Sequence, residues 1–199
     1  MTHHSSSRRQ LGHVLAALLS TAFLSIVLFS TLFFSTTAQA ACNELQDFSA
    51  TKLRSSKTVN FCEQFGGKAM LVVNTASQCG YTPQFKGLEA LHKRYGDKLA
   101  IVGFPSDDFN QEHAESEKIA DVCYLNYGVT FTMLEPSKVT GDDANPLFKQ
   151  LAQRSGQQPG WNFTKYLVSA DGTQVTHFPS KVTPESDDFI AALEASLKE

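Results

Sequence analysis

The sequence lacks features that mark several large classes of protein. After residue 41 it has no internal repeat, no low-complexity tract and no proline- or glycine-rich linker, so residues 41–199 are expected to form one domain. This part also lacks a basic cluster. Without Arg8 and Arg9, the only charged residues among the first 40, the net charge falls from −3 to −5. The folded domain is therefore not expected to bind nucleic acid or an anionic membrane surface.

The first 40 residues lack acidic side chains and carry a long apolar run instead. Arg8 and Arg9 form a basic start, Leu11–Phe34 is mostly apolar, and Ala38-Gln39-Ala40 offers a cleavage site of the small-x-small type. This pattern predicts that residues 1–40 are a signal peptide and that the protein is exported, either to the periplasm or out of the cell. The apolar run is also long enough to span a bilayer, so an uncleaved membrane anchor is the alternative.

The chain lacks a Cys-x-x-Cys pair, because Thr82 stands where the second cysteine after Cys79 would be. Met70–Val73 is an unbroken apolar run typical of a buried strand, and Pro83 suits the first turn of a helix. Cys79 is thus expected between a strand and a helix N-terminus, where unpaired N–H groups stabilise a thiolate. The alternative is a buried structural cysteine.

A lone reactive thiol at Cys79 favours reaction with a peroxide over dithiol exchange. Local dithiol exchange of the thioredoxin kind needs the second cysteine and is therefore disfavoured. A single thiolate suits attack on a peroxide, which leaves a sulfenic acid on the sulfur.

Four cysteines are few enough for their pairing to be considered one by one. They are Cys42, Cys62, Cys79 and Cys123, and all lie in the part expected to be exported, where disulfides persist. Cys42 and Cys62 are the two outside the candidate redox site, and they flank Phe48–Phe61, which is expected to form a β-hairpin around a polar turn. We therefore favour a structural Cys42–Cys62 disulfide, with two unpaired thiols as the alternative.

The remaining patterns predict an α/β fold. Leu99–Pro105 is expected to be a second buried strand, Ser106–His113 a polar loop, and Glu115–Asn126 a helix with Cys123 on its apolar face. Consecutive strands joined by a helix pair in parallel, so the loops that follow them, one of them holding Cys79, should meet at one edge of the sheet.

The C-terminal third supplies the other elements. Asn145-Pro146 is expected to start a helix, Tyr166–Phe178 to form a second hairpin, and Thr183-Pro184 to open a last helix. The order of elements matches a thioredoxin-like fold, with a central mixed β-sheet flanked by helices and an N-terminal β-hairpin.

Several motifs, in order and at characteristic spacing, together resemble the glutathione peroxidase family. They are Val73–Gln84, Gly103–Pro105, Gln111-Glu112, Tyr127–Phe131 and Trp161–Lys165. The similarity extends from about Leu45 to the C-terminus and is greatest to the cysteine-containing, thioredoxin-dependent branch. It implies a catalytic tetrad of Cys79, Gln111, Trp161 and Asn162, with Cys123 as resolving cysteine and without a metal or cofactor.

The resemblance implies a thiol-dependent peroxidase for hydrogen peroxide and organic or lipid hydroperoxides, active in oxidative stress defence. The side chains of Gln111, Trp161 and Asn162 can donate hydrogen bonds without titrating. The expected reductant is a thioredoxin-like protein or glutathione. The chain between Tyr127 and Asn145 is short and lacks the additional loop that oligomeric, glutathione-using members of the family carry near there, so the resemblance implies a monomer. A glutathione-dependent peroxidase that uses one cysteine, and a redox sensor that relays the oxidation of Cys79, remain alternatives.

Two departures from the family pattern affect the site. Ser106-Asp107-Asp108 stands where the family often has Cys-Asn-Gln, which removes a third thiol. The loop that leads to Gln111 is also one residue shorter, so the position of Gln111 is the least constrained of the four.

Overall fold

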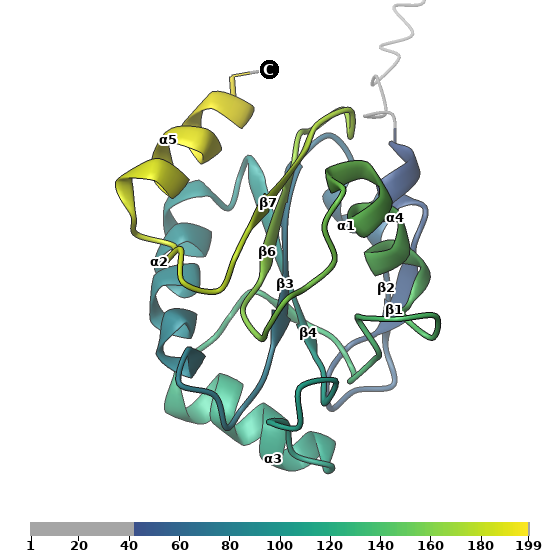
Figure 1. Cartoon of the computed structure of the whole chain (residues 1–199), viewed down its shortest axis with the longest axis vertical. Helices are drawn as coiled ribbons and strands as arrows, with labels where there is room; N and C mark the ends of the chain where they lie inside the picture. Colours follow the sequence, from purple (N-terminus) through teal and green to yellow (C-terminus); the bar gives the residue numbers. More distant parts are fainter. Residues whose placement is uncertain (1–41, 199) are drawn as a thin grey trace, which may run out of the picture. The chain divides into compact units, whose positions relative to one another are not determined.

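A computed structural model describes residues 42–198 (Figure 1). Its centre is a five-stranded mixed sheet. In spatial order the strands are β5 (Thr132–Met133), β4 (Leu99–Pro105), β3 (Ala69–Thr75), β6 (Lys165–Val168) and β7 (Val175–Phe178). β3 pairs in parallel with β4 and antiparallel with β6. The predicted signal segment, residues 1–40, lies outside the described residues.

Helices cover both faces of the sheet, as Figure 1 shows. α2 (Phe85–Tyr95) and α5 (Asp187–Ser196) lie on one face, whereas α1 (Phe61–Phe65) and α4 (Pro146–Ser155) lie on the other. All seven residues of β3 are buried, because successive side chains point to opposite faces and each face is covered. This topology confirms the thioredoxin-like α/β fold expected from the sequence.

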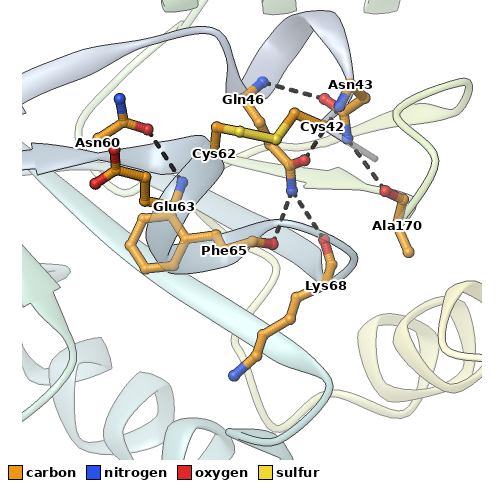
Figure 2. The surroundings of a disulfide bond; sticks show 9 residues. All are labelled: Cys42, Asn43, Gln46, Asn60, Cys62, Glu63, Phe65, Lys68 and Ala170. Carbon is orange, nitrogen blue, oxygen red and sulfur yellow. Dashed lines mark hydrogen bonds between the residues drawn. A yellow bond between two sulfur atoms is a disulfide. The ribbon is translucent and has the colours of Figure 1, made fainter. Parts of the chain in front are cut away.

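The N-terminal hairpin is also confirmed, with a disulfide beside it. β1 (Ser49–Thr51) pairs antiparallel with β2 (Thr58–Asn60), and α1 follows directly. Cys42 and Cys62 form a disulfide, with their Cα atoms 5.3 Å apart. Figure 2 shows this bond beside the short 3₁₀-helix η1 (Glu44–Gln46).

Hydrogen bonds fasten the disulfide-bearing segment to the domain. The Gln46 side chain donates to the Phe65 carbonyl at 2.9 Å, and the Asn43 side chain donates to the Ala170 carbonyl at 3.1 Å (Figure 2). The N-terminal segment is therefore tied both to α1 and to the β6–β7 turn.

Helix boundaries follow the sequence at one helix and depart from it at two. The Asn145 side chain accepts the Phe148 N–H at 3.0 Å and caps α4, as expected. The last helix begins at Asp187 rather than at Thr183, because the Ser186 N–H donates to the Thr183 carbonyl and closes a separate turn first.

The helix predicted over residues 115–126 is two elements. α3 (Ser116–Ala120) passes into the π-helix η3 (Asp121–Asn126), whose wider turn leaves Asn126 exposed rather than packed. Across residues 42–198, no helix has both the length and the apolar character that crossing a bilayer requires.

Candidate active site

Cys79 lies in a tight turn that follows β3. The sequence predicted an α-helix directly after it, but the 3₁₀-helix η2 (Thr82–Gln84) intervenes and α2 begins only at Phe85. Cys79 is 8% exposed, and its sulfur accepts the Tyr81 N–H at 3.4 Å. The turn therefore supplies a backbone donor to the sulfur.

Thr82 holds this turn closed. Its hydroxyl oxygen accepts the Cys79 N–H at 3.1 Å and lies 2.7 Å from the Cys79 carbonyl and 2.9 Å from the Ala76 carbonyl, either of which can take its single proton. The residue that replaces the second cysteine of a Cys-x-x-Cys motif thus supports the shape of the turn. Its role was missed from the sequence, where Thr82 counted only as an absent cysteine.

The loop after β4 contacts the Cys79 turn, as the strand order predicted. The Gln78 N–H donates to the Gln111 carbonyl at 2.9 Å, and the Ser77 N–H donates to the Glu112 carboxylate at 3.0 Å. Glu112 also accepts the His113 N–H at 2.9 Å. Burial raises the pKa of the Glu112 carboxyl, although these hydrogen bonds oppose that effect. Two loops from neighbouring strands are therefore joined beside the thiol.

Two of the predicted tetrad residues contact each other directly. The Asn162 side-chain nitrogen donates to the Gln111 side-chain oxygen at 3.1 Å. Asn162 is fully buried, and its side-chain oxygen has no partner within the described part of the chain. Because Gln111 accepts through its oxygen, its amide nitrogen is left to donate elsewhere.

Trp161 lies beside Asn162 and remains 42% exposed. Its ring is 5.2 Å from that of Phe109, centroid to centroid. Its carbonyl accepts hydrogen bonds from the Asn74 side chain at 3.1 Å and from the Thr164 hydroxyl at 2.9 Å. The Trp161 backbone is thus fixed to the end of β3, while its indole borders solvent.

A cavity of about 510 Å³ lies against Trp161. Its wall includes Tyr81, whose N–H contacts the Cys79 sulfur, and the side chains of His177 and Lys181. Burial lowers the pKa of the His177 imidazole, and the nearby Lys165 lowers it further. The cavity therefore shares Tyr81 with the Cys79 turn and is bordered by an aromatic ring and a cation.

Cys123 lies within η3 and is only 1% exposed. It belongs to the same buried cluster as Cys79, and both thiols are free. Burial, with a smaller contribution from the Glu112 carboxylate, raises the pKa of the Cys123 thiol to about 12. The two predicted redox cysteines thus share one core but are not bonded.

The predicted site residues therefore lie on adjoining segments. Gln111 joins the Cys79 turn through its backbone and Asn162 through its side chain, and Trp161 precedes Asn162. The contacts missed from the sequence are the Tyr81 N–H, the Thr82 hydroxyl and the Glu112 carboxylate. A backbone donor leaves no sequence signal, whereas the position of Thr82 three residues after Cys79 could have indicated a turn.

Known proteins are similar to this chain in both sequence and structure. The glutathione peroxidase family model matches residues 45–152. A glutathione peroxidase of Lactococcus lactis is 47% identical over 145 residues, which are 70% of this chain and 91% of that protein. The hydroperoxy fatty acid reductase gpx1 of Synechocystis is 41% identical over 81% of this chain and 99% of its own length. The crystal structure of apo Trgpx superposes with a TM-score of 0.61 at 31% identity, covering 80% of this chain and 98% of that one. The chain belongs to the glutathione peroxidase family and is a peroxidase.

Proposed function

We propose that Cys79 is the peroxidatic thiol of a peroxidase that reduces hydrogen peroxide and organic hydroperoxides. The observation that carries this proposal is the hydrogen bond between Asn162 and Gln111, since it brings amides from positions 51 apart in the sequence together next to the Cys79 turn. Amide groups at such a place can donate to a thiolate or to a leaving oxygen at any working pH.

The first half-reaction changes both sulfur and peroxide. The Cys79 thiolate attacks one peroxide oxygen, the O–O bond breaks, and Cys79 becomes a sulfenic acid. The second oxygen leaves as hydroxide or alkoxide and takes a proton to become water or an alcohol. The side chains of Gln111, Trp161 and Asn162 are the donors that stabilise the charge on the sulfur and on the leaving oxygen.

The second half-reaction uses Cys123. Its thiolate attacks the Cys79 sulfur, so that a disulfide forms and hydroxide leaves as water after protonation. Because Cys123 is only 1% exposed and burial raises the pKa of its thiol to about 12, we infer that the residue leaves the core before it reacts. η3 is suited to opening, since π-helices are rare and their hydrogen bonds span five residues, as from the Tyr127 N–H to the Val122 carbonyl.

The chain that follows η3 is anchored to α2, which limits how far η3 can unwind. The Glu89 carboxylate accepts the Thr130 N–H at 2.8 Å and so ties the segment after η3 to α2. A disulfide needs Cα atoms within ~7 Å, so we infer that η3 unwinds between Ala120 and this anchor.

The names of relatives support the choice of reductant and substrate. A relative in Chlamydomonas reinhardtii, 48% identical over 126 residues, is a glutathione peroxidase-like peroxiredoxin, and a Synechocystis relative is a hydroperoxy fatty acid reductase. We infer that a thioredoxin-type dithiol reduces the Cys79–Cys123 disulfide, and that lipid hydroperoxides are among the substrates in oxidative stress defence. Glutathione is the alternative reductant.

We also propose that the protein is exported as a monomer after removal of residues 1–40. A structural disulfide at Cys42, just after the proposed cleavage site, supports export because such bonds persist in oxidising compartments. The intact mass of the protein recovered from the periplasm or the medium tests cleavage after Ala40.

Steady-state turnover with two reductant systems tests the reaction. Wild type and Cys123→Ser are compared with thioredoxin plus its reductase and with glutathione plus its reductase. We expect thioredoxin to support wild type and to fail with Cys123→Ser. Equal turnover of both proteins with glutathione would instead establish a peroxidase that uses one cysteine, and no turnover with either system would contradict the peroxidase assignment.

A further inference from the structure

Lys165 is a buried lysine without an acidic partner. It is the first residue of β6, 0% exposed, and lies between Val73 of β3 and Phe178 of β7. Fully buried lysines are normally paired with a carboxylate, but among residues 42–198 no ion pair includes Lys165. Burial lowers the pKa of its ammonium to about 7. Burying a lysine here without an ion pair opposes folding, so the part of the molecule that its side chain contacts is of interest.

The contact of Lys165 is with a residue in a disfavoured conformation. Its Nζ donates to the Phe163 carbonyl at 2.6 Å. Phe163 is fully buried and has a φ of +63°, in the left-handed region that residues with a β-carbon rarely adopt. The Phe163 N–H donates to the Asn74 carbonyl at 2.7 Å. Hydrogen bonds therefore hold both polar groups of Phe163, one to β3 and one to Lys165.

The strained residue directly follows the side chains proposed to act on the peroxide. Asn162 precedes it and contacts Gln111, and the Trp161 carbonyl is held by the Asn74 side chain. If Phe163 returned to a negative φ, the direction of the chain before it would change. Asn162 and Trp161 would then move relative to the Cys79 turn.

We propose that Lys165 is a positioning residue whose side-chain nitrogen fixes the Phe163 carbonyl and thereby holds Trp161 and Asn162 in place for the reaction at Cys79. The inference rests on the proposed function of those residues. It predicts that activity and stability change in opposite directions when the Lys165 side-chain nitrogen is removed. Activity should fall because the backbone of residues 161–163 is no longer held. Stability should be kept or rise because an unpaired buried charge is removed.

The test uses Lys165→Met, which keeps the length of the side chain and removes the donor. Lys68→Met is the matched control, because the Lys68 Nζ also donates to a backbone carbonyl, that of Gly96, at 2.8 Å, and Lys68 precedes the opposite end of β3. Two properties are measured in both variants: the rate constant for oxidation of Cys79 by hydrogen peroxide, and the fluorescence of Trp161. Trp161 is the only tryptophan of the chain, so its emission and its quenching by acrylamide report directly on the segment of residues 161–163.

We expect Lys165→Met to lower the rate constant at least tenfold, to change the emission and quenching of Trp161, and to keep or raise the urea midpoint of unfolding. Lys68→Met should keep the wild-type rate and emission. A Lys165→Met protein with wild-type rate and emission would overturn the proposal, as would a loss of rate that only follows the loss of folded protein.

Two provisions keep the test decisive. Lys165→Gln is shorter and retains a neutral donor, so it replaces Lys165→Met if that variant does not fold, and we expect its rate to lie between those of Lys165→Met and wild type. A wild-type rate in folded Lys165→Gln with altered Trp161 emission would also count against the proposal. If wild-type protein does not react with peroxide, the proposed function fails. The Trp161 emission still decides whether Lys165 holds residues 161–163 in place.

Discussion

The two free cysteines lie in one buried cluster, but their local backbones differ. Cys79 follows a strand, in a turn where its sulfur accepts the Tyr81 N–H. Cys123 lies inside η3, where burial first and Glu112 second raise its thiol pKa to about 12. The contrast shows that two thiols buried in one cluster can have different local hydrogen bonding. In the proposed mechanism the thiol in the turn, which already has a donor, reacts first, and the thiol packed within the helix reacts after it is exposed.

Replacing Cys79 by serine should break the comparison most strongly. We expect the rate of peroxide reduction to fall on the order of 10⁴-fold or more, because a serine hydroxyl lacks the thiolate that attacks the peroxide. Stopped-flow consumption of hydrogen peroxide measures this loss. A rate within tenfold of wild type would mean that another residue is the nucleophile.

Removing the Cys42–Cys62 disulfide should affect stability and leave the contrast between the free thiols intact. The two cysteines are 20 residues apart, so we expect the double serine variant to lose about 3 kcal/mol of unfolding free energy. Urea unfolding measures this change. The rate of Cys79 oxidation should stay within about twofold of wild type, since the disulfide lies outside the site. A large fall in that rate would link the disulfide to the reaction.

Replacing Asn162 by alanine should slow the reaction of Cys79 by removing one of its proposed hydrogen-bond donors. It removes one amide and leaves Gln111 without its partner, so we expect the rate of Cys79 oxidation to fall by about 100-fold. Asn60→Ala is the control, because the Asn60 side chain caps α1 on the Glu63 N–H, away from the site. Equal rates in the two variants would remove Asn162 from the mechanism.

The pH dependence of stability should distinguish two buried groups whose pKa values shift in opposite directions on folding, Lys165 and Cys123. The Lys165 pKa falls from 10.5 to about 7 on folding, so between these values the unfolded chain binds more protons and stability rises with pH. We expect wild type to gain about 1 kcal/mol relative to Lys165→Met from pH 7 to pH 8 in urea titrations.

Other groups do not obscure that pH effect. His177, on the adjacent strand, lies opposite Tyr166, and burial first and the charge of the nearby Lys165 second lower its pKa, but that lowered pKa lies below this window. Cys123 has the opposite sign, because its pKa rises from 9.0 to about 12 on folding and its contribution falls with pH only above about 9. It is also common to both proteins and cancels in the difference. A difference that does not change with pH would contradict the burial of a charged Lys165.

The features of the fold that depend on residues close in the sequence were predictable. The apolar runs at β3 and β4, the Asn145 cap of α4, and the meeting of the Cys79 and Gln111 loops all follow from local chemistry and strand order. The fold and the location of the site were therefore accessible from the sequence.

Features that depend on tertiary contacts were not predictable. The periodicity around Cys123 could not separate an α-helix from a π-helix, because the two differ by one residue in the span of a hydrogen bond. The left-handed conformation of Phe163 and the burial of Lys165 had no sequence signal either, since each arises from packing against strands distant in the chain. The late start of α5 reflects a separate turn closed by Ser186.

The most direct test of the two-cysteine account is the mass of the protein after one equivalent of hydrogen peroxide, with thiol mapping, in wild type and in Cys123→Ser. The account predicts a Cys79–Cys123 disulfide in wild type and a sulfenic acid on Cys79 in the variant, formed at the same rate. It would be contradicted if Cys79 remained a thiol in both proteins, or if wild type accumulated the sulfenic acid while Cys123 stayed reduced.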